Sequence, residues 1–243
     1  MPSTKDQLFN HPLSDIPPFE FNAQVANVFP DMIHRSVPGY RTVIAQLSVI
    51  AAYYAQPHSR YYDLGCSLGA ATCAMAQAIK QPNCEFIAVD QSQAMLEKCR
   101  QQLNALEFSH PIELVCADIA DVVIADASIV VLNFTLQFIP QEKRDALIQK
   151  IYQGLNPGGI LILSEKIIFN NAYQENALNE LHLAFKRAQG YSELEISQKR
   201  SALEKILNPE TLEQHQQRLT QEGFRQVLPW FQCFNFASLI AQK

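Results

Sequence analysis

Short runs of apolar residues alternate along the middle of the chain with longer stretches whose apolar residues recur every three or four positions. The short runs predict buried strands, and the periodic stretches predict amphipathic helices. Five strands are predicted here, at residues 59–65, 84–92, 112–121, 127–138 and 159–167. Helices are predicted after the first, second and fourth of them, at residues 69–79, 93–106 and 141–155. Apolar strands separated by helices are typical of a parallel sheet covered on both faces.

The N-terminal part of the chain differs from this alternation. We expect irregular structure up to about residue 22, followed by short helical pieces that are broken at Pro30 and Pro38. Proline lacks the backbone N–H that a helix interior needs, so it favours such breaks. A longer periodic stretch predicts a helix over residues 41–55.

The C-terminal part contains an interruption. Residues 170–208 are long, helical in pattern and polar on one face, where a simple alternation would have returned to the sheet. Insertions of this kind commonly form a lid or a partner interface. A helix is then predicted over residues 209–223, and two strand-like runs in residues 225–243 predict an antiparallel pair at the sheet edge.

The pattern therefore predicts an α/β fold with a seven-stranded, mostly parallel sheet and an antiparallel C-terminal edge hairpin. At 243 residues, we expect one domain spanning residues 1–243. Within it, we expect a helical cap over about residues 1–58 and a helical insertion over about residues 170–208.

Composition narrows the class of protein. A hydrophobic share of 48% with 18% charged residues is enough to bury a sizeable core. The net charge is -5 and no Lys/Arg cluster is present, so we expect no direct binding to nucleic acid. No run reaches the roughly 18 apolar residues of a membrane helix, and no export signal is visible. The six cysteines form no C-x-x-C pair and are expected to be reduced core thiols, which favours a cytoplasmic protein.

The sequence YYDLGCSLGAAT, residues 61–72, predicts a strand-to-helix turn that holds a nucleotide. Asp63 ends the strand, and Gly65 and Gly69 allow a sharp turn with a ligand close to the backbone. The dinucleotide fingerprint G-x-G-x-x-G is not met, because Ser67 stands where a second glycine would let the backbone reach a pyrophosphate. The turn therefore disfavours NAD.

Polar residues follow the next strands in turn. Asp90 follows the second strand, 21 residues after Gly69, where a carboxylate accepts both ribose hydroxyls. Asp118 and Ile119 follow the third strand and suit an adenine amine and ring face, and Asn133 lies near the ligand-facing end of the fourth. Ligands of open α/β sheets bind at the carboxyl ends of the strands, so these residues predict one binding site.

The motifs DLGCSLG, AVDQS, CADIAD and NPGG resemble those of the Rossmann-like class I S-adenosylmethionine (SAM) methyltransferase fold over about residues 40–165. The segments VFPDMIHRSVPGY, LNFTLQF, FKRAQGYSELEISQKRSALE and WFQCFNF are similar to those of the carboxy-S-adenosylmethionine synthase family. That second resemblance covers nearly the whole chain.

The resemblance implies an unusual transferase. SAM would be carboxylated on its methyl group, prephenate would supply carbon dioxide and leave as phenylpyruvate, and the product would serve a separate enzyme that modifies a tRNA wobble uridine. It implies a homodimer with no metal, no cofactor beyond SAM and no certain catalytic residue. The predicted SAM contacts are Tyr40, Gly65, Cys66, Ser67, Asp90, Gln91, Asp118, Ile119 and Asn133.

Arg200 carries over from the family as the partner of the new carboxylate, which a guanidinium binds in bidentate fashion. From spacing alone it would be an exposed helix residue, and it could act within one chain or across a dimer. The residues that bind prephenate stay open among Arg35, Tyr61, Lys199 and Tyr191. Histidines such as His182 and His215 are isolated, and we expect surface or core positions for them.

Two alternatives to the synthase remain open from the sequence. One is a conventional SAM-dependent methyltransferase acting on a small molecule or tRNA, although the loop after the fourth strand lacks an Asp-Pro-Pro-type motif. The other is a non-catalytic SAM-binding protein that keeps the fold as a scaffold or sensor.

Overall fold

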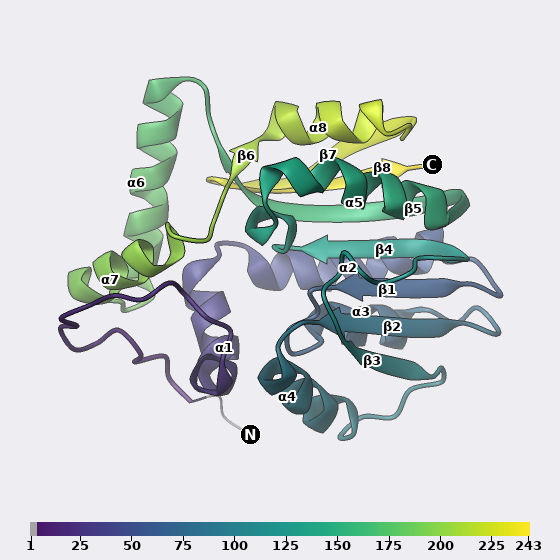
Figure 1. Ribbon diagram of the computed structural model, residues 1–243, viewed down its shortest axis with the longest axis horizontal. Helices are drawn as coiled ribbons and strands as arrows, with labels where there is room; N and C mark the ends of the chain where they lie inside the picture. Colours follow the sequence, from purple (N-terminus) through teal and green to yellow (C-terminus); the bar gives the residue numbers. More distant parts are fainter. Residues whose placement is uncertain (1–3) are drawn as a thin grey trace.

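The computed structural model describes residues 4–243 as a twisted sheet flanked by helices (Figure 1). The main path of the sheet has the order β3-β2-β1-β4-β5-β8-β7, and the short β6 pairs with β5. The strands are β1 (Arg60–Leu64), β2 (Glu85–Asp90), β3 (Ile112–Cys116), β4 (Ala127–Asn133), β5 (Leu155–Ile168), β6 (Glu210–Thr211), β7 (Gln226–Cys233) and β8 (Phe236–Gln242). The helices are α1 (Ala23–Ser36), α2 (Tyr40–Tyr54), α3 (Ala70–Ala78), α4 (Gln93–Leu103), α5 (Gln141–Gly154), α6 (Ala172–Ala188), α7 (Glu193–Leu203) and α8 (Leu212–Gln221), with a 3-10 turn η1 (Leu136–Phe138).

Strand directions agree with the predicted fold. Strands β1 to β5 pair in parallel, while β8 runs antiparallel to β5 and β7 runs antiparallel to β8. The seven strands of the main path and the antiparallel C-terminal pair are therefore confirmed. The two-residue strand β6, which is parallel to the end of β5, was not predicted because it is too short to leave a pattern.

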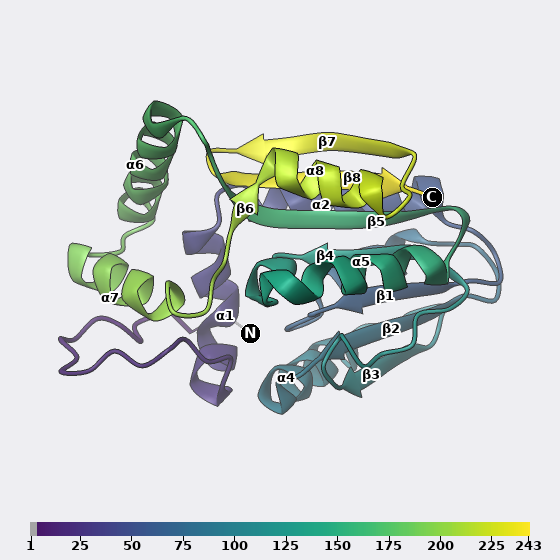
Figure 2. The ribbon, with the colours of Figure 1, turned by 45° about the horizontal axis from the view of Figure 1, so that its top comes forward.

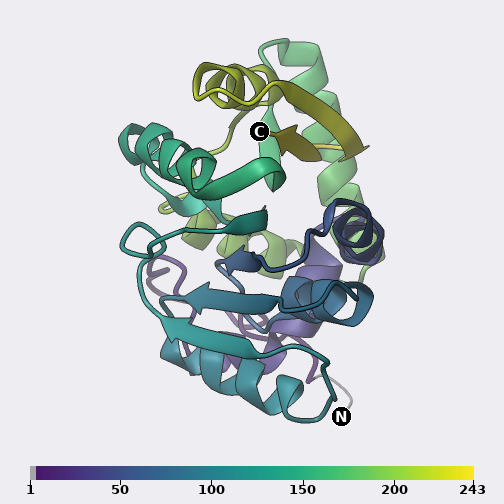
Figure 3. The ribbon, with the colours of Figure 1, turned by 90° about the vertical axis from the view of Figure 1, so that its right-hand side faces the viewer.

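Helices cover both faces of the sheet, as Figure 3 shows from the side. Alternate residues of each strand point to opposite faces, so neighbouring positions join different cores. Tyr62, Val130 and Leu161 pack with residues of α5 and α8, whereas Tyr61, Ile129 and Ile160 pack with residues of α2 and α3. This double burial explains why the central strands are apolar throughout.

The inserted helices and the N-terminal part of the chain lie together at one end of the sheet. Figures 1 and 2 show α1, α6 and α7 beyond the end toward which the β4 arrow points. The Gln198 side chain of α7 donates to the carbonyls of Phe9 and His11 at 2.9 and 2.8 Å and accepts from the Leu13 N–H. The irregular N-terminal segment is thus fixed against the insertion, and both sit at the carboxyl ends of the parallel strands.

The break predicted at Pro30 is wrong. Helix α1 runs from Ala23 to Ser36 with Pro30 inside it. A proline in a helix interior costs about 3 kcal/mol, which burial of the apolar face of α1 offsets. That face includes Val25, Val28 and Met32, which pack in one buried cluster. The break at Pro38 is confirmed, because α1 ends before it and α2 begins after it.

Other boundaries moved by a few residues. Strand β4 ends at Asn133 and is followed by η1, where a strand to residue 138 was predicted. Helix α5 ends at Gly154, so the predicted end of this helix before residues 156–159 is confirmed. Strand β5 begins earlier than predicted and includes residues 156–159, where the pairing with β4 is irregular between Ala127 and Ile129. The extra residues of β5 at that point form a bulge rather than a loop.

Three structural findings bear on the composition-based expectations. All six cysteines are free, but Cys116 is exposed and Cys73 and Cys233 are half-buried, so the description as core thiols holds only for Cys66, Cys84 and Cys99. His182 and His215 are buried, as expected for core positions. Among residues 4–243, no helix combines the length and apolarity needed to cross a bilayer.

Candidate functional site

The turn between β1 and α3 requires glycine at two positions. Gly65 has a φ of 81°, and a Cβ atom there would lie 2.5 Å from the Thr135 side chain. Gly69 precedes α3 with a φ of 78°, and its Cβ would lie 2.6 Å from Cys99 Sγ. At both positions the positive φ and the short distance to a neighbouring side chain exclude a Cβ atom. Glycine therefore leaves the backbone of this turn accessible to a ligand.

Ser67 adopts the left-handed conformation that the missing glycine would have favoured, with a φ of 49°. Its N–H donates to Asp90 Oδ2 at 2.8 Å, and the Ser92 N–H donates to Asp90 Oδ1 at 2.8 Å. The Asp90 carboxylate therefore ties the β1 turn to the β2 turn. Burial raises the pKa of Asp90, and these two backbone donors oppose that rise.

Asp63 at the end of β1 holds the start of α3. It accepts from the Thr72 N–H at 3.0 Å and from the Thr72 hydroxyl at 2.6 Å, and burial raises its pKa to about 6. Tyr40, the first residue of α2, has its ring 6.2 Å from that of Phe134, which follows β4, and burial together with the Asp63 charge raises the pKa of its hydroxyl. Asp63 thus orients the turn, and Tyr40 supplies an aromatic wall.

The predicted SAM contacts that follow β2 and β3 differ in their exposure to solvent. Ile119 is buried, whereas Asp118 and Gln91 are exposed. The Asp118 carboxylate accepts from the Ala120 N–H at 2.8 Å, which fixes the turn after β3. An apolar face next to an exposed acid suits a purine whose edge carries an amine.

Asn133 ends β4 with an unsatisfied acceptor. Its amide oxygen Oδ1 is buried and has no hydrogen-bond partner within residues 4–243. Buried polar groups are hydrogen-bonded in nearly all folded proteins, so an exception at a strand end points to a ligand that supplies the donor. SAM carries such donors in its ammonium, its amine and its ribose hydroxyls, and the position fits it.

The sheet order brings these positions together. Because β3, β2, β1 and β4 are neighbours and parallel, the residues that end them lie at the same edge. The residues placed there are Gly65, Cys66, Ser67, Asp90, Gln91, Asp118, Ile119 and Asn133, with Tyr40 joining from α2. Arg200 is not among them.

Arg200 lies on α7, with 54% of its side chain exposed, and pairs with Glu204 Oε1 at 2.5 Å. It is close enough to Lys166 and Lys186 that its charge lowers the pKa of both ammonium groups. The structure thus places Arg200 on the insertion, near other cationic side chains and outside the set of residues that end the parallel strands.

The proposed prephenate residues separate into two groups. Arg35, Tyr191 and Lys199 lie together with Asp6: the Lys199 ammonium pairs with Asp6 at 3.2 Å, and the Arg35 guanidinium stacks 3.8 Å over the Tyr191 ring. Tyr61 is different. It is buried in the core under α2 and α3, and its hydroxyl donates to the Gln56 carbonyl at 2.9 Å. Tyr61 is therefore removed from the set of substrate contacts.

A surface cavity of about 570 Å³ lies away from these residues. Its lining comes from the segment before β4, the end of α5 and the start of β5, including Ile124, Asp126 and Asn156. It sits at the amino ends of the strands, whereas ligands of open α/β sheets bind at the carboxyl ends. The cavity therefore does not mark the nucleotide site.

Comparison with known proteins identifies the family. The family described as "Methyltransferase domain" matches residues 62–159. A protein of Trichlorobacter lovleyi named carboxy-S-adenosyl-L-methionine synthase is 59% identical over 100% of both chains. Proteins with the same name from Aeromonas hydrophila and Shewanella oneidensis are 57% and 54% identical over 96% or more of each chain. The chain belongs to the carboxy-S-adenosyl-L-methionine synthase family.

Solved structures show the fold that the synthase family shares with methyltransferases. Human N-acetylserotonin methyltransferase, solved with SAM, superposes with a TM-score of 0.60 at 16% identity, covering 91% of this chain and 55% of the human one. Magnesium protoporphyrin IX methyltransferase of Synechocystis, also solved with SAM, gives a TM-score of 0.58 at 15% identity, covering 84% and 80%. These structures establish the fold alone.

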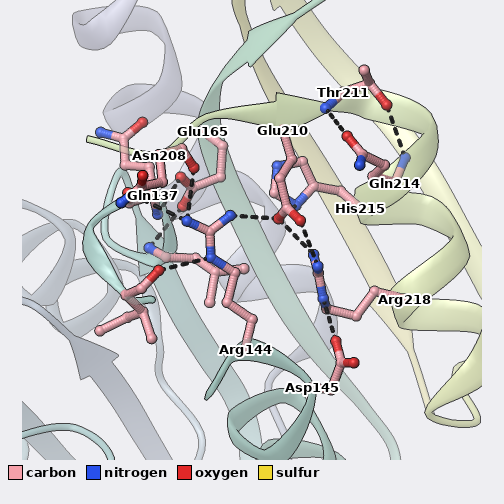
Figure 4. A network of polar contacts seen from close by, with 12 residues as sticks. Gln137, Arg144, Asp145, Glu165, Asn208, Glu210, Thr211, Gln214, His215 and Arg218 are labelled. Carbon is pink, nitrogen blue, oxygen red and sulfur yellow. Dashed lines mark hydrogen bonds and ion pairs between the residues drawn. The ribbon is translucent and has the colours of Figure 1, made fainter. Parts of the chain in front are cut away.

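A buried polar network fixes the segment that follows Asn133 at the end of β4 (Figure 4). Glu165 of β5 accepts from the Leu136 and Gln137 N–H groups at 2.9 and 2.8 Å, which fixes η1 after Asn133. Arg144 of α5 is fully buried and pairs with Glu210 at 2.5 Å. Through Arg144, helix α5 is thus joined to the loop after β4 and to the segment that leads from α7 into β6.

Two lysines that the sequence did not single out, Lys166 and Lys186, come together near the inserted helices. Lys166 follows Glu165 near the end of β5, and Lys186 is one turn after His182 on α6. Their positions in the sequence give no signal, because their proximity depends on the contact of the His182 ring of α6 with Phe236 of β8, the cross-strand partner of Lys166.

Proposed function

We propose that the chain converts SAM and prephenate to carboxy-S-adenosylmethionine and phenylpyruvate. The observation that carries this proposal is identity of up to 59% over the full length with proteins named for that product. Prephenate as the carbon dioxide donor comes from the family resemblance, and the unsatisfied Asn133 oxygen beside the glycine turn supports SAM as the bound nucleotide.

The chemistry of the two substrates accounts for the reaction without a further reagent. Loss of a carboxylate and a hydroxyl converts prephenate to phenylpyruvate, carbon dioxide and hydroxide. The sulfonium acidifies the SAM methyl, so the hydroxide removes one methyl proton and becomes water. The ylide carbon then bonds to carbon dioxide, and the new carboxylate completes the product. We propose no metal and no cofactor beyond SAM.

Residues of this chain would position the partners rather than transfer protons. Asp90 would accept the ribose hydroxyls, Ile119 would pack against the adenine, and the Gly65 turn would hold the methionyl part of SAM. Enclosure by Tyr40 and the inserted helices would keep carbon dioxide near the ylide. Proximity and exclusion of water supply large rate effects in such reactions.

Arg200 is proposed to bind the new carboxylate, and its test is a ratio of affinities. We predict that Arg200→Ala weakens binding of carboxy-SAM by 10-fold or more, since a charge-assisted hydrogen bond contributes about 1.5–3 kcal/mol. SAM lacks that carboxylate, so its dissociation constant should change by less than twofold. Titration calorimetry with both ligands measures the two constants. Equal losses for SAM and carboxy-SAM contradict the role.

We also propose that the chain acts as a homodimer through the inserted helices. Tyr173 and Leu181 of α6 are 81% and 47% exposed, and Leu194 of α7 is exposed nearby on the same insertion. Apolar side chains concentrated on one exposed segment favour a protein interface. Such a dimer would bring Arg200 of one chain near the other chain, and light scattering during size-exclusion chromatography measures the mass.

The use of the product by a second enzyme is proposed from the family resemblance. Carboxy-SAM would supply the carboxymethyl group to a separate enzyme that modifies a tRNA wobble uridine, and this chain would not bind the tRNA itself. The net charge of -5 supports that division. Six free cysteines support a reducing compartment, the cytoplasm.

One assay separates the proposed function from its alternatives. The protein is incubated with SAM and prephenate, and the products are analysed by mass spectrometry. The proposal predicts SAM carrying an added carboxyl together with phenylpyruvate. S-adenosylhomocysteine with a methylated acceptor would instead show a conventional methyltransferase, and SAM binding without turnover would show a non-catalytic binding protein.

A further inference from the structure

Three cationic side chains converge beside the inserted helices. Lys166 lies near the carboxyl end of β5, Lys186 near the end of α6 and Arg200 near the end of α7. Burial is the main cause that lowers the pKa of Lys186, and the charges of Lys199, Lys166 and Arg200 add to it, so these cations surround its ammonium group. Cations gathered at a partly buried position repel one another, and an anion that binds among them relieves that repulsion.

Lys186 is the most buried member of this cluster. It is 8% exposed, and its ammonium, which keeps some contact with solvent, forms no hydrogen bond or ion pair within the part of the chain from residue 4 onward. Burial, then Lys199, Lys166 and Arg200, lowers its pKa to about 7, and no carboxylate contributes in the opposite direction. Burying an ammonium without a partner is costly, so this position is unfavourable in the free protein.

The nearest acids are already engaged. Glu175 and Glu204 raise the pKa of Lys166, and neither forms an ion pair with it. Glu175 accepts from the Phe169 N–H at 2.9 Å, and Glu204 pairs with Arg200 at 2.5 Å. Within residues 4–243, these acids therefore offset the charge of Lys166 only in part, and no acid contributes to the pKa shift of Lys186.

Aromatic rings connect this cluster with the SAM site. Lys166 is the cross-strand partner of Phe236, and the ring of His182, one turn before Lys186, lies 5.0 Å from the Phe236 ring. Phe134 lies 5.9 Å from Phe236 and directly follows Asn133. A ligand that spans from the SAM methyl to the lysines would pass along these rings.

We infer that Lys166 and Lys186 form a carboxylate subsite that binds the carboxylate which the carbon dioxide donor keeps. The inference rests on the proposed function, in which the donor has two carboxylates and loses one. A cation held on the departing carboxylate would stabilise the substrate before it reacts, so the buried lysines suit the carboxylate that stays. Phenylpyruvate retains that group and binds the same subsite.

The test measures phenylpyruvate binding directly. Titration calorimetry is carried out with wild type, Lys186→Met and Lys166→Met, with the exposed Lys80→Met as a matched control. We expect the dissociation constant of phenylpyruvate to rise at least 10-fold in the first two variants and to stay within twofold in Lys80→Met. The constant for SAM should stay within twofold in all variants.

A melting temperature separates binding from folding. Lys186→Met removes a buried unpaired cation, so its melting temperature at pH 7 should equal or exceed that of wild type. Lys199→Met breaks the ion pair with Asp6 and should lower the melting temperature. This variant shows that the measurement detects the loss of a lysine that stabilises the fold.

Three results would overturn the inference: phenylpyruvate affinity unchanged in Lys186→Met, weaker binding of carboxy-SAM but not of phenylpyruvate, or no phenylpyruvate binding by wild type. The mass assay for carboxy-SAM is run on the same wild-type sample. If that sample forms carboxy-SAM while Lys186→Met binds phenylpyruvate normally, only the subsite is wrong. If it forms none while Lys186→Met loses phenylpyruvate, only the reaction is wrong.

Discussion

His215 is buried on α8, and neither of its ring nitrogens has a hydrogen-bond partner within residues 4–243. Burial lowers its pKa from the ordinary 6.5 to about 4, although Glu210 at 4.0 Å opposes the change. Between pH 6.5 and 4 the unfolded chain therefore binds a proton that the folded chain does not. Stability that is present above pH 6.5 is lost as the pH falls toward 4.

We predict that His215→Leu flattens this part of the pH dependence. A shift of this size corresponds to roughly 3 kcal/mol between the two limits, and the apolar side chain removes it. Urea unfolding at several values between pH 4 and 7.5 measures the slope, with the exposed His11→Leu as control. Part of the dependence of stability on pH should remain in His215→Leu, because the pKa of His182 is also lowered, to about 3. An unchanged slope in His215→Leu contradicts the assignment.

Ser67 shows what could and could not be predicted at the scale of one residue. The sequence indicated a turn that departs from the dinucleotide pattern because a glycine is missing. The backbone at Ser67 nevertheless takes the positive φ that glycine favours, since the bond from its N–H to Asp90 holds it there. That bond joins residues 23 positions apart, so no local pattern reports it.

At the scale of elements, Arg144 fixes the return of the chain from the insertion. The fully buried guanidinium donates to Glu210 at 2.5 Å, to the Asn208 carbonyl at 2.7 Å and to the Ile139 carbonyl at 2.9 Å. Three elements therefore depend on one side chain: α5, the loop before it and the segment that leads into β6. Removing one partner of a buried ion pair leaves the other unpaired.

We predict that Arg144→Met destabilises the protein by about 3–5 kcal/mol, the usual cost of breaking a buried pair from one side. Urea unfolding at pH 7 measures the free energy of unfolding. The control is Arg187→Met, because Arg187 pairs with Glu193 at an exposed position, where a salt bridge contributes little to stability. Similar losses in both variants would mean that the network does not hold the elements together.

The elements also show where sequence patterns reach their limit. Apolar runs identified β1, β2, β4 and β8 because burial on one or two faces leaves a simple pattern. Helix α1 was divided at Pro30 because propensity argued for a break, and tertiary packing of its apolar face outweighed it. The two-residue β6 and the bulge in β5 depend on partners elsewhere in the chain, so the sequence could not indicate them.

At the scale of the whole molecule, the sequence predicted the residues at the strand ends better than the residues near the insertion. Residues at the ends of neighbouring parallel strands, such as Asp90 and Asn133, could be predicted because sheet topology alone brings them together. The proposed subsite of Lys166 and Lys186 could not, because their proximity depends on the contact of α6 with Phe236 of β8, the cross-strand partner of Lys166. The insertion thus adds the feature that distinguishes this fold from a simple nucleotide-binding sheet.

The central claim is that the new carboxyl group of SAM comes from prephenate. The most direct measurement uses prephenate labelled with carbon-13 in its ring carboxylate, incubated with SAM and the protein in unlabelled bicarbonate. The account predicts carboxy-SAM heavier by one mass unit in its added carboxyl, with phenylpyruvate unlabelled. Carboxy-SAM without the label, or label retained in phenylpyruvate, would contradict it.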